Sequence, residues 1–334
     1  MEQNFIYAPD LAGDVFRCKV PLKDTRQHFI VNGRVQGGAS PMQFSLGRGE
    51  VMEQMLQLIS IRNGKGEGVL STTSSFRFEE GSNGRILQCF HTFSEEEFYT
   101  EDTIEIALEA GSSAEFFILQ NEHDRAFHKT SYNIRLAERA TLNMVFLSLH
   151  GGKIENNLDV SLEGSRAECN LGGLCLTDGR QTMINNINLV HKVADCRSNQ
   201  LFKGILDDEG VARFFGHITV VKDAQRTEAL QANHNILISD KAKAYSKPQL
   251  EIYADDVKCS HGSTVGRLDE DEIFYMRTRG IPESEARIMQ QAAFAYEVLE
   301  RISHAELRER MLMMTEGRLR GEYSSCRNCS RNCC

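Results

Sequence analysis

Short apolar runs separated by polar corners make up most of the chain. From about Ser71 to Leu268 the runs are of β type, such as FRFEE, AEFFILQ and TLNMVFLSLH, and Gly, Asn, Asp and Ser separate them. Between residues 170 and 254 the runs recur roughly every 13 to 18 residues without a strict motif. Strands of this length and spacing are typical of an all-β sandwich or of a β-solenoid, in which each coil stacks on the previous one.

Two observations favour the solenoid. The NG and DG pairs that mark tight hairpins are scarce between adjacent runs, whereas loose polar corners such as SDKAKAYSKP and LDDEGV are common. We therefore expect residues 71–268 to form a β-solenoid core.

The pattern becomes helical after Leu268. Acidic residues crowd the first turn of one predicted helix, Gly280 follows its basic end, and Pro282 opens the next. We expect a helical domain over residues 269–322. The second helix carries an apolar stripe that either packs on the β domain or forms a docking surface for a partner. The stripe consists of Ile288, Ala292, Ala295, Leu299 and Ile302.

The two ends of the chain differ from this core. Residues 1–70 are expected to form a short N-terminal segment, with an amphipathic helix over GEVMEQMLQLISIR (49–62). Residues 323–334, which include SSCRNCSRNCC, are typical of a tail rather than of a secondary-structure element.

Charge and composition exclude several classes of function. The 38 Lys and Arg against 47 Asp and Glu give a net charge of −9, which argues against binding to nucleic acid or to an anionic membrane. We find no signal peptide and no apolar stretch of about 18 residues, so we expect a cytoplasmic protein whose ten cysteines are reduced. The phosphate-binding, Rossmann and nucleophile-elbow motifs are also absent, so the chain is not expected to hydrolyse ATP by itself.

The stretch DDVKCSHGSTVG (255–266) brings a cysteine and a histidine together. The apolar parity of the preceding run changes after Asp255 and Asp256, which predicts a corner at the two aspartates. Beyond the corner Val257, Cys259 and His261 fall on one face.

A thiol and an imidazole on one face have several uses. They can bind a metal, hold an iron–sulfur species, carry a persulfide, or act as nucleophile and base with Asp256 as an orienting acid. They can also be a buried cysteine beside a hydrogen-bonded histidine. His234 precedes an apolar run one or two coils earlier, so stacking can bring it near the pair. His128 lies in a polar segment and is expected to be solvated.

The tail holds a second group of thiols. Cys326, Cys329, Cys333 and Cys334 have the number and spacing to bind zinc, copper(I) or an iron–sulfur cluster, but no surrounding residues of a built metal site. The tail is either a disordered thiol segment or a real metal or sulfur acceptor.

Residues 233–281 carry a specific resemblance. The segment NHNILISDKAKAYSKPQLEIYADDVKCSHGSTVGRLDEDEIFYMRTRGI resembles the SufB/SufD family of the SUF iron–sulfur cluster assembly machinery, above all in KPQLEIYADDVKCSHG and FYMRTRGI. A weaker similarity extends back through most of the chain. The resemblance implies a right-handed parallel β-helix followed by a C-terminal α-helical domain.

The resemblance also implies partners. A SufB-like subunit would pair edge to edge with the β-helix, two copies of the SufC ATPase would dock on the C-terminal helices, and a transient iron–sulfur cluster would pass from the interface to carrier proteins. ATP would enter only through SufC. The resemblance leaves open whether reduced flavin supplies electrons, and an unpaired edge also suits a homodimer of the isolated chain.

Two sequence differences place the chain on the SufD side of this family. It lacks both the cysteine before the run at 233–238 and the E-H-E-A sequence of SufB-type subunits. The resemblance makes His261 the interface residue for cluster assembly and Cys259 a further contributor. We therefore expect a non-catalytic scaffold subunit; the alternative is a stand-alone metal- or thiol-dependent enzyme that uses Cys259 and His261.

Overall fold

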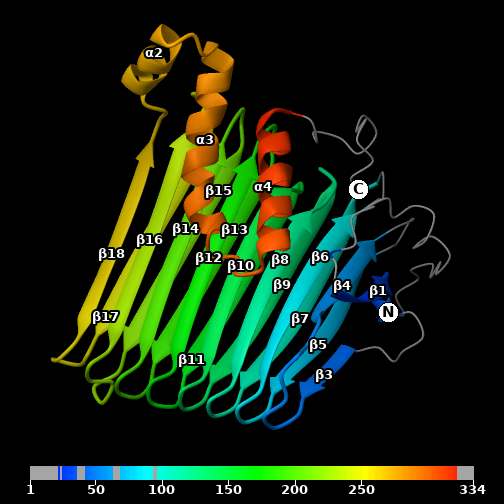
Figure 1. Cartoon of the computed structure of the whole chain (residues 1–334), viewed down its shortest axis with the longest axis vertical. Coiled ribbons are helices and arrows are strands. Elements are labelled where there is room, and N and C mark those ends of the chain that lie inside the picture. Colours follow the sequence, from blue (N-terminus) through cyan, green and yellow to red (C-terminus); the bar gives the residue numbers. More distant parts are fainter. Residues whose placement is uncertain (1–21, 23–24, 36–41, 63–67, 93–95, 322–334) are drawn as a thin grey trace.

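Two β-sheets, parallel except for one two-residue strand at an edge, form the body of the molecule (Figure 1). The computed structural model describes residues 22, 25–35, 42–62, 68–92 and 96–321. The ten-stranded sheet has the spatial order β18 (Lys258–Gly266), β16 (Glu228–Leu237), β14 (Arg197–Leu206), β12 (Glu168–Thr177), β10 (Thr141–His150), β8 (Ser113–Asn121), β6 (Asn83–Thr92), β4 (Met55–Arg62), β1 (Thr25–Val31) and β2 (Arg34–Val35). The eight-stranded sheet has the order β17 (Lys243–Ile252), β15 (Val211–Val220), β13 (Thr182–His191), β11 (Lys153–Leu162), β9 (Ala126–Leu136), β7 (Phe98–Leu108), β5 (Val69–Phe78) and β3 (Met42–Leu46).

Each coil of the solenoid contributes one strand to each sheet. In the ten-stranded sheet Glu168 pairs with Arg197, Arg197 with Glu228, and Glu228 with Lys258, so one coil takes about 30 residues. The shorter spacing of apolar runs in the sequence is therefore the distance from a strand in one sheet to the next strand in the other. The prediction of a parallel β-helix is confirmed.

Side chains from the inner faces of both sheets fill the interior. Alternate residues along each strand point inward, so the same strand positions recur as buried positions in successive coils. Aromatic rings stack across the lumen in edge-to-face contacts: Phe76 meets Phe116 with 5.3 Å between ring centroids, and Tyr132 meets Phe146 at 5.4 Å. This apolar filling holds the two sheets together.

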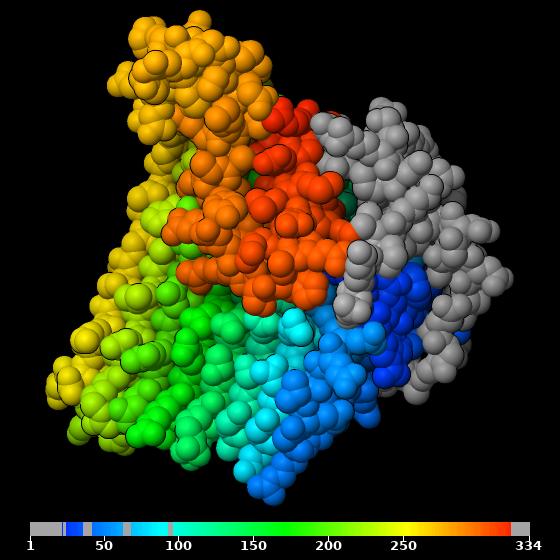
Figure 2. Space-filling model, in the orientation of Figure 1, coloured from blue at the N-terminus to red at the C-terminus, as the bar shows by residue number. Residues whose placement is uncertain are grey.

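Three helices follow the β-helix: α2 (Glu270–Thr278), α3 (Glu283–Leu299) and α4 (Ala305–Leu319). Figures 1 and 2 show α3 and α4 lying on the outer face of the ten-stranded sheet, while α2 lies beyond the strand ends. Of the predicted apolar stripe, Ala295, Leu299 and Ile302 are buried against this sheet. Packing is thus the role of that part of the stripe.

Buried cations fix the helices to the sheet. Lys203 of β14 donates to the Phe294 carbonyl oxygen of α3 at 3.1 Å and pairs with the Glu297 carboxylate. Arg318 of α4 donates to the Leu149 carbonyl oxygen at 3.0 Å. These hydrogen bonds satisfy the buried donors and add to the apolar contacts between the helices and the sheet.

The prediction of a helix over residues 49–62 is wrong. Residues 55–62 instead form β4, and the β-helix begins at β1 rather than at residue 71. In β4 the Leu56 and Leu58 side chains belong to the interior, whereas Met55 packs on the outer face. Burial on both faces produces a continuous apolar run, and periodicity alone does not distinguish such a strand from a buried helix.

The filled interior predicts the effect of a small substitution in β12. A β-carbon at Gly173 would collide with the Phe202 ring, so Gly173→Ala is expected to lower the free energy of unfolding by about 1–3 kcal/mol. Gly262→Ala in β18 is the control, because no atom lies within 4 Å of its β-carbon position. Urea unfolding of the two variants measures the difference. Equal stability of both would contradict close packing at Gly173.

Candidate functional site at the edge strand

The last coil leaves one edge of each sheet open. β18 bonds only to β16, and β17 only to β15, within the part of the chain that the structure describes. Almost every residue of β18 is exposed, and Figure 2 shows this strand along a margin of the molecule. An edge of this kind presents a row of backbone donors and acceptors to another strand.

The predicted corner is present between β17 and β18. Residues 253–257 connect the two strands, and Arg226 and Asp256 join this corner to the preceding coil through a backbone hydrogen bond of 2.6 Å. Ala254, Val257 and Cys259 all contact the interior cluster. The change of parity at the aspartates therefore keeps the apolar side of both strands facing inward.

Cys259 and His261 lie on the inward-facing side of the edge strand. Cys259 is half-buried, and His261, two residues further along the same face, is exposed because no coil covers it. The His261 side chain makes no hydrogen bond to any residue that the structure describes. Its imidazole is thus open at the end of the solenoid.

Burial disfavours the thiolate form of Cys259. Burial raises the pKa of Cys259, and the hydrogen bond from the Ala229 backbone only partly offsets that effect. The thiolate is the reactive form of cysteine, so a raised pKa reduces its reactivity. No hydrogen bond joins Asp256 to Cys259 or His261 in the described ranges, and the orienting role considered for this acid has no contact to support it.

His234 lies on the opposite face of the sheet from His261. It occupies the neighbouring strand β16, where its Nδ1 atom lies 2.8 Å from the Thr264 hydroxyl of β18. Burial and the nearby Lys203 ammonium lower the pKa of His234. Stacking thus brings the two histidines onto adjacent strands, but strand alternation points their side chains apart.

The structure contains no complete metal site among its described residues. No group of three or more His, Cys, Asp and Glu side chains in those ranges is arranged to hold a metal ion. Cys326, Cys329, Cys333 and Cys334 lie outside the described residues. The edge strand therefore offers a single exposed imidazole beside a half-buried thiol.

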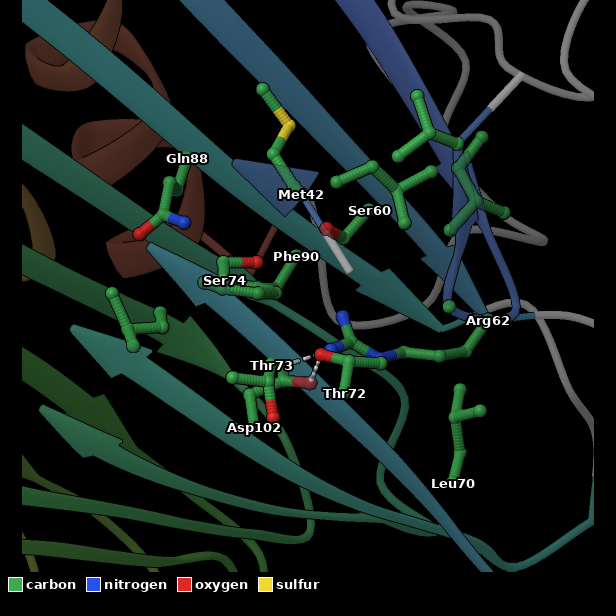
Figure 3. Close-up of a pocket in the computed structure, with 15 residues that line it drawn as sticks. Met42, Ser60, Arg62, Leu70, Thr72, Thr73, Ser74, Gln88, Phe90 and Asp102 are labelled. Atoms are coloured by element: carbon green, nitrogen blue, oxygen red, sulfur yellow. Dashed lines mark hydrogen bonds and ion pairs between the residues drawn. The ribbon is translucent and has the colours of Figure 1, made fainter. Parts of the chain in front are cut away.

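A buried charged cluster lies inside the lumen near the other end of the solenoid. Arg62 donates to Asp102 at 2.6 Å, and Thr72 also donates to this carboxylate (Figure 3). His128 bridges Asp102, at 2.9 Å from Nε2, and Glu122, at 2.5 Å from Nδ1. These charged side chains are at most 4% exposed. The expectation that His128 is solvated is wrong.

Opposite charges set the protonation of this cluster. Burial opposes ionisation of Asp102, but the Arg62 guanidinium and the hydrogen bond from His128 outweigh it and lower the pKa of Asp102 to about 2. Burial likewise opposes ionisation of Glu122, but its contact with His128 outweighs burial and lowers the pKa of Glu122 to about 2. Burial also opposes the charged form of His128, yet its contacts with the carboxylates raise its pKa.

Sequence reasoning missed this cluster because its members lie on five strands or their ends. A signal was available in FYTEDTIEIAL, where Asp102 shares its face with Ile104 and Ile106, both buried. An aspartate at an inward position needs a partner, since an isolated buried charge is unfavourable. The adjoining cavity of about 30 Å³, lined by Arg62 and Gln88, has room for about one water molecule. We assign the cluster a structural role.

Comparisons with known proteins identify the family of the chain. Residues 61–294 match the family described as "SUF system FeS cluster assembly, SufBD core domain". The chain is 33% identical to the iron–sulfur cluster assembly protein SufD of Escherichia coli over 82% of its own length and 66% of that protein. It is 32% identical to a SufBD family protein of Synechocystis over 73% of this chain and 54% of the relative. It is also 31% identical to the chloroplastic protein ABCI7 of Arabidopsis thaliana, over 72% of this chain and 51% of that protein.

The fold is thus a parallel β-helix with an edge strand at its end and C-terminal helices. The chain belongs to the SufBD core family of the SUF system. Within that family it is of the SufD type. The chain spans between about half and two thirds of the length of these relatives. None of its described helices is long and apolar enough to cross a membrane.

The charged cluster predicts how stability depends on pH. Because the pKa values of Asp102 and Glu122 are lowered, these groups stabilise the fold at any pH above their ordinary pKa values of 3.8 and 4.5. This stability is lost as the pH falls towards about 2. The raised pKa of His128 adds stability below its ordinary value of 6.5, which is lost as the pH rises through the folded-state value. The free energy of unfolding should therefore decline on both sides of a plateau between about pH 4.5 and 6.5.

Asp102→Asn tests the cluster directly. Removing one partner of a buried ion pair is expected to cost about 3–5 kcal/mol at pH 6 and to flatten the acid limb of the profile. The exposed neighbour Glu101→Gln should change stability by less than about 0.5 kcal/mol. Urea unfolding from pH 2 to 9 measures both effects. An acid limb unchanged in Asp102→Asn would show that Asp102 does not titrate as argued.

Proposed function

We propose that this chain is a non-catalytic scaffold subunit for iron–sulfur cluster assembly in the SUF system, acting in the cytoplasm. One observation carries the proposal: His261, in the segment that most resembles the family, is an exposed imidazole on the edge strand β18, whose outer side no described strand covers. A ligand at an open edge is available both to a second subunit and to a metal ion.

The incomplete donor set suits a cluster that must be released. A scaffold holds its cargo weakly, and four thiolates from one chain would retain it. His261, with Cys259 as a second contributor, supplies only part of the ligands, and the rest would come from a SufB-like subunit. The cluster is thus a transient cargo of the pair rather than a resident cofactor of this chain.

The open edges of β17 and β18 support pairing with that subunit. A homologous β-helix has strands of similar spacing, so its own edge can continue both sheets through backbone hydrogen bonds. The same geometry allows two copies of this chain to pair when no other subunit is present. In the complete assembly the interface would enclose His261.

The helices support docking of an ATPase. α2 and α3 expose Phe274, Tyr275, Met289 and Tyr296, and exposed aromatic and methionine side chains are typical of interfaces. We assign this surface to the SufC ATPase, which would supply ATP hydrolysis to the complex. The finished cluster would pass from the subunit interface to carrier proteins, and a reduced flavin is a candidate electron source for the complex.

A stand-alone thiol-dependent enzyme fits the site less well. It would need a thiolate at Cys259 and an oriented base at His261, but burial raises the pKa of Cys259 and Asp256 makes no hydrogen bond to either residue among those described. We therefore assign no catalytic residue.

The ATPase surface is tested by isolating the protein from cells. The tagged chain should retain a SufB-like and a SufC-like chain, and Phe274→Ser should lose the SufC-like chain because it removes a large exposed aromatic contact. Met313→Ser on α4 is the matched control, since Phe274 and Met313 are both 65% exposed. Isolation of the wild-type chain alone, without ATPase activity, would contradict the proposed function.

The assembly site is tested by His261→Ala. We expect cluster formation by the reconstituted complex to fall at least about tenfold, because a ligand at the interface is lost. His217→Ala is the control, as it removes a histidine from the outer face of the other sheet. Cluster formation is followed by absorbance and by the content of iron and sulfide. An unchanged yield in His261→Ala would mean that the site is assigned to the wrong residue.

A further inference from the structure

Gln231 has a buried side-chain amide next to the proposed assembly site, and the family resemblance assigns no role to this residue. We propose that Gln231 is a positioning residue for His261: the two side chains are not hydrogen-bonded in the structure, and when the imidazole turns into the lumen the Gln231 carbonyl oxygen accepts a hydrogen bond from one ring nitrogen and leaves the other nitrogen for the metal ion. The role toward metal rests on the proposed function, whereas the hydrogen bond itself does not.

Strand pairing brings the two side chains together. Gln231 of β16 pairs in register with His261 of β18, two positions after the pair Ala229 and Cys259. Ala229 is fully buried and Cys259 contacts the interior cluster, so this face of both strands points into the lumen. In-register neighbours on adjacent strands lie about 4.8 Å apart, and a glutamine side chain can span that distance.

A hydrogen bond to the previous coil orients the Gln231 amide. Its Nε2 atom donates to Oε1 of Gln200 on β14 at 2.9 Å. With Nε2 engaged by Gln200, the carbonyl oxygen is the polar atom that this side chain has available to a donor on β18. Gln231 is 2% exposed, and its Oε1 has no partner among the described residues. A buried acceptor without a donor is an unfavourable arrangement that a nearby N–H group relieves.

The opposite sheet leaves space for this arrangement. Gly216 of β15 faces Gln231 across the lumen, and a β-carbon there would collide with the Gln231 amide. One coil later Pro248 pairs with Gly216, so Pro248 takes the matching place opposite His261. A proline ring offers no hydrogen-bond acceptor. Ser246, also on the inner face of β17 with an unpartnered hydroxyl, is the other polar group to consider.

The hydrogen bond would decide which ring nitrogen binds metal. A neutral imidazole carries one N–H and one lone pair, and an acceptor fixed beside one nitrogen holds the proton there. The lone pair of the other nitrogen then points away from Gln231, toward the open end of the solenoid. Outer partners of this kind orient metal-binding histidines in many sites.

Nitrogen NMR on the isolated full-length chain tests the hydrogen bond without any cluster. The ring nitrogen shifts of His261, assigned by their loss in His261→Ala, are expected to show one dominant tautomer in the wild type. Gln231→Leu should give a mixture of tautomers, and Gln231→Glu should retain the single tautomer because an acceptor is kept. His234, on the outer face of the same sheet, is the internal control and should not change.

Two further variants leave Gln231 and His261 in place. Gly216→Ala should reproduce the mixture seen in Gln231→Leu, because its β-carbon displaces the amide, whereas Ser246→Ala should keep the wild-type tautomer. Circular dichroism confirms that each variant folds. An unchanged His261 tautomer in both folded Gln231→Leu and folded Gly216→Ala would overturn the proposal, as would a change in Ser246→Ala alone.

Reconstitution separates this inference from the proposed function. With the complete complex, cluster formation by Gln231→Leu should fall about tenfold. If His261→Ala leaves cluster formation unchanged, the proposed function fails while the NMR result on Gln231 stands. If His261→Ala abolishes cluster formation and the tautomer does not depend on Gln231, only the positioning role fails.

Discussion

The hydrogen-bonded register between successive coils is the constraint on which the structure depends. Every strand from β4 to β16 bonds to a strand of the coil before it and to one of the coil after it, and this fixes which side chains point inward. The inward residues fill the lumen, and the outward residues of one sheet carry α3 and α4. Nothing in this stacking ends it, so in the part of the chain that the structure describes no strand pairs with the outer side of β17 or β18. The site lies at that end.

The sequence predicted the architecture because its signals are local and repeated. Alternating apolar strands, few tight hairpins and the change to a helical pattern after Leu268 all recur or extend over many residues. The helix predicted over 49–62 failed for the opposite reason: β4 is one short strand buried on both faces, and its apolar run carries no period of its own.

Prediction of the site depended on counting strand positions. The parity change at Asp255 and Asp256 correctly placed Val257 and Cys259 on one face, because alternation holds within a strand. The position of His234 needed the register between two strands, and a single sequence does not contain that register. The same limit hid the cluster of Arg62, Asp102 and His128, whose members meet only after three coils have stacked.

The coil of about 30 residues has a consequence for how such a chain can change its length. Loss or gain of one residue within a strand turns every later side chain of that strand to the other face, which places polar groups in the lumen and apolar ones in water. Removal of one whole coil, in contrast, leaves each remaining coil in contact with an equivalent neighbour. A solenoid of this type can therefore lengthen or shorten in whole coils while its terminal edge, with the residues that it presents, is kept intact.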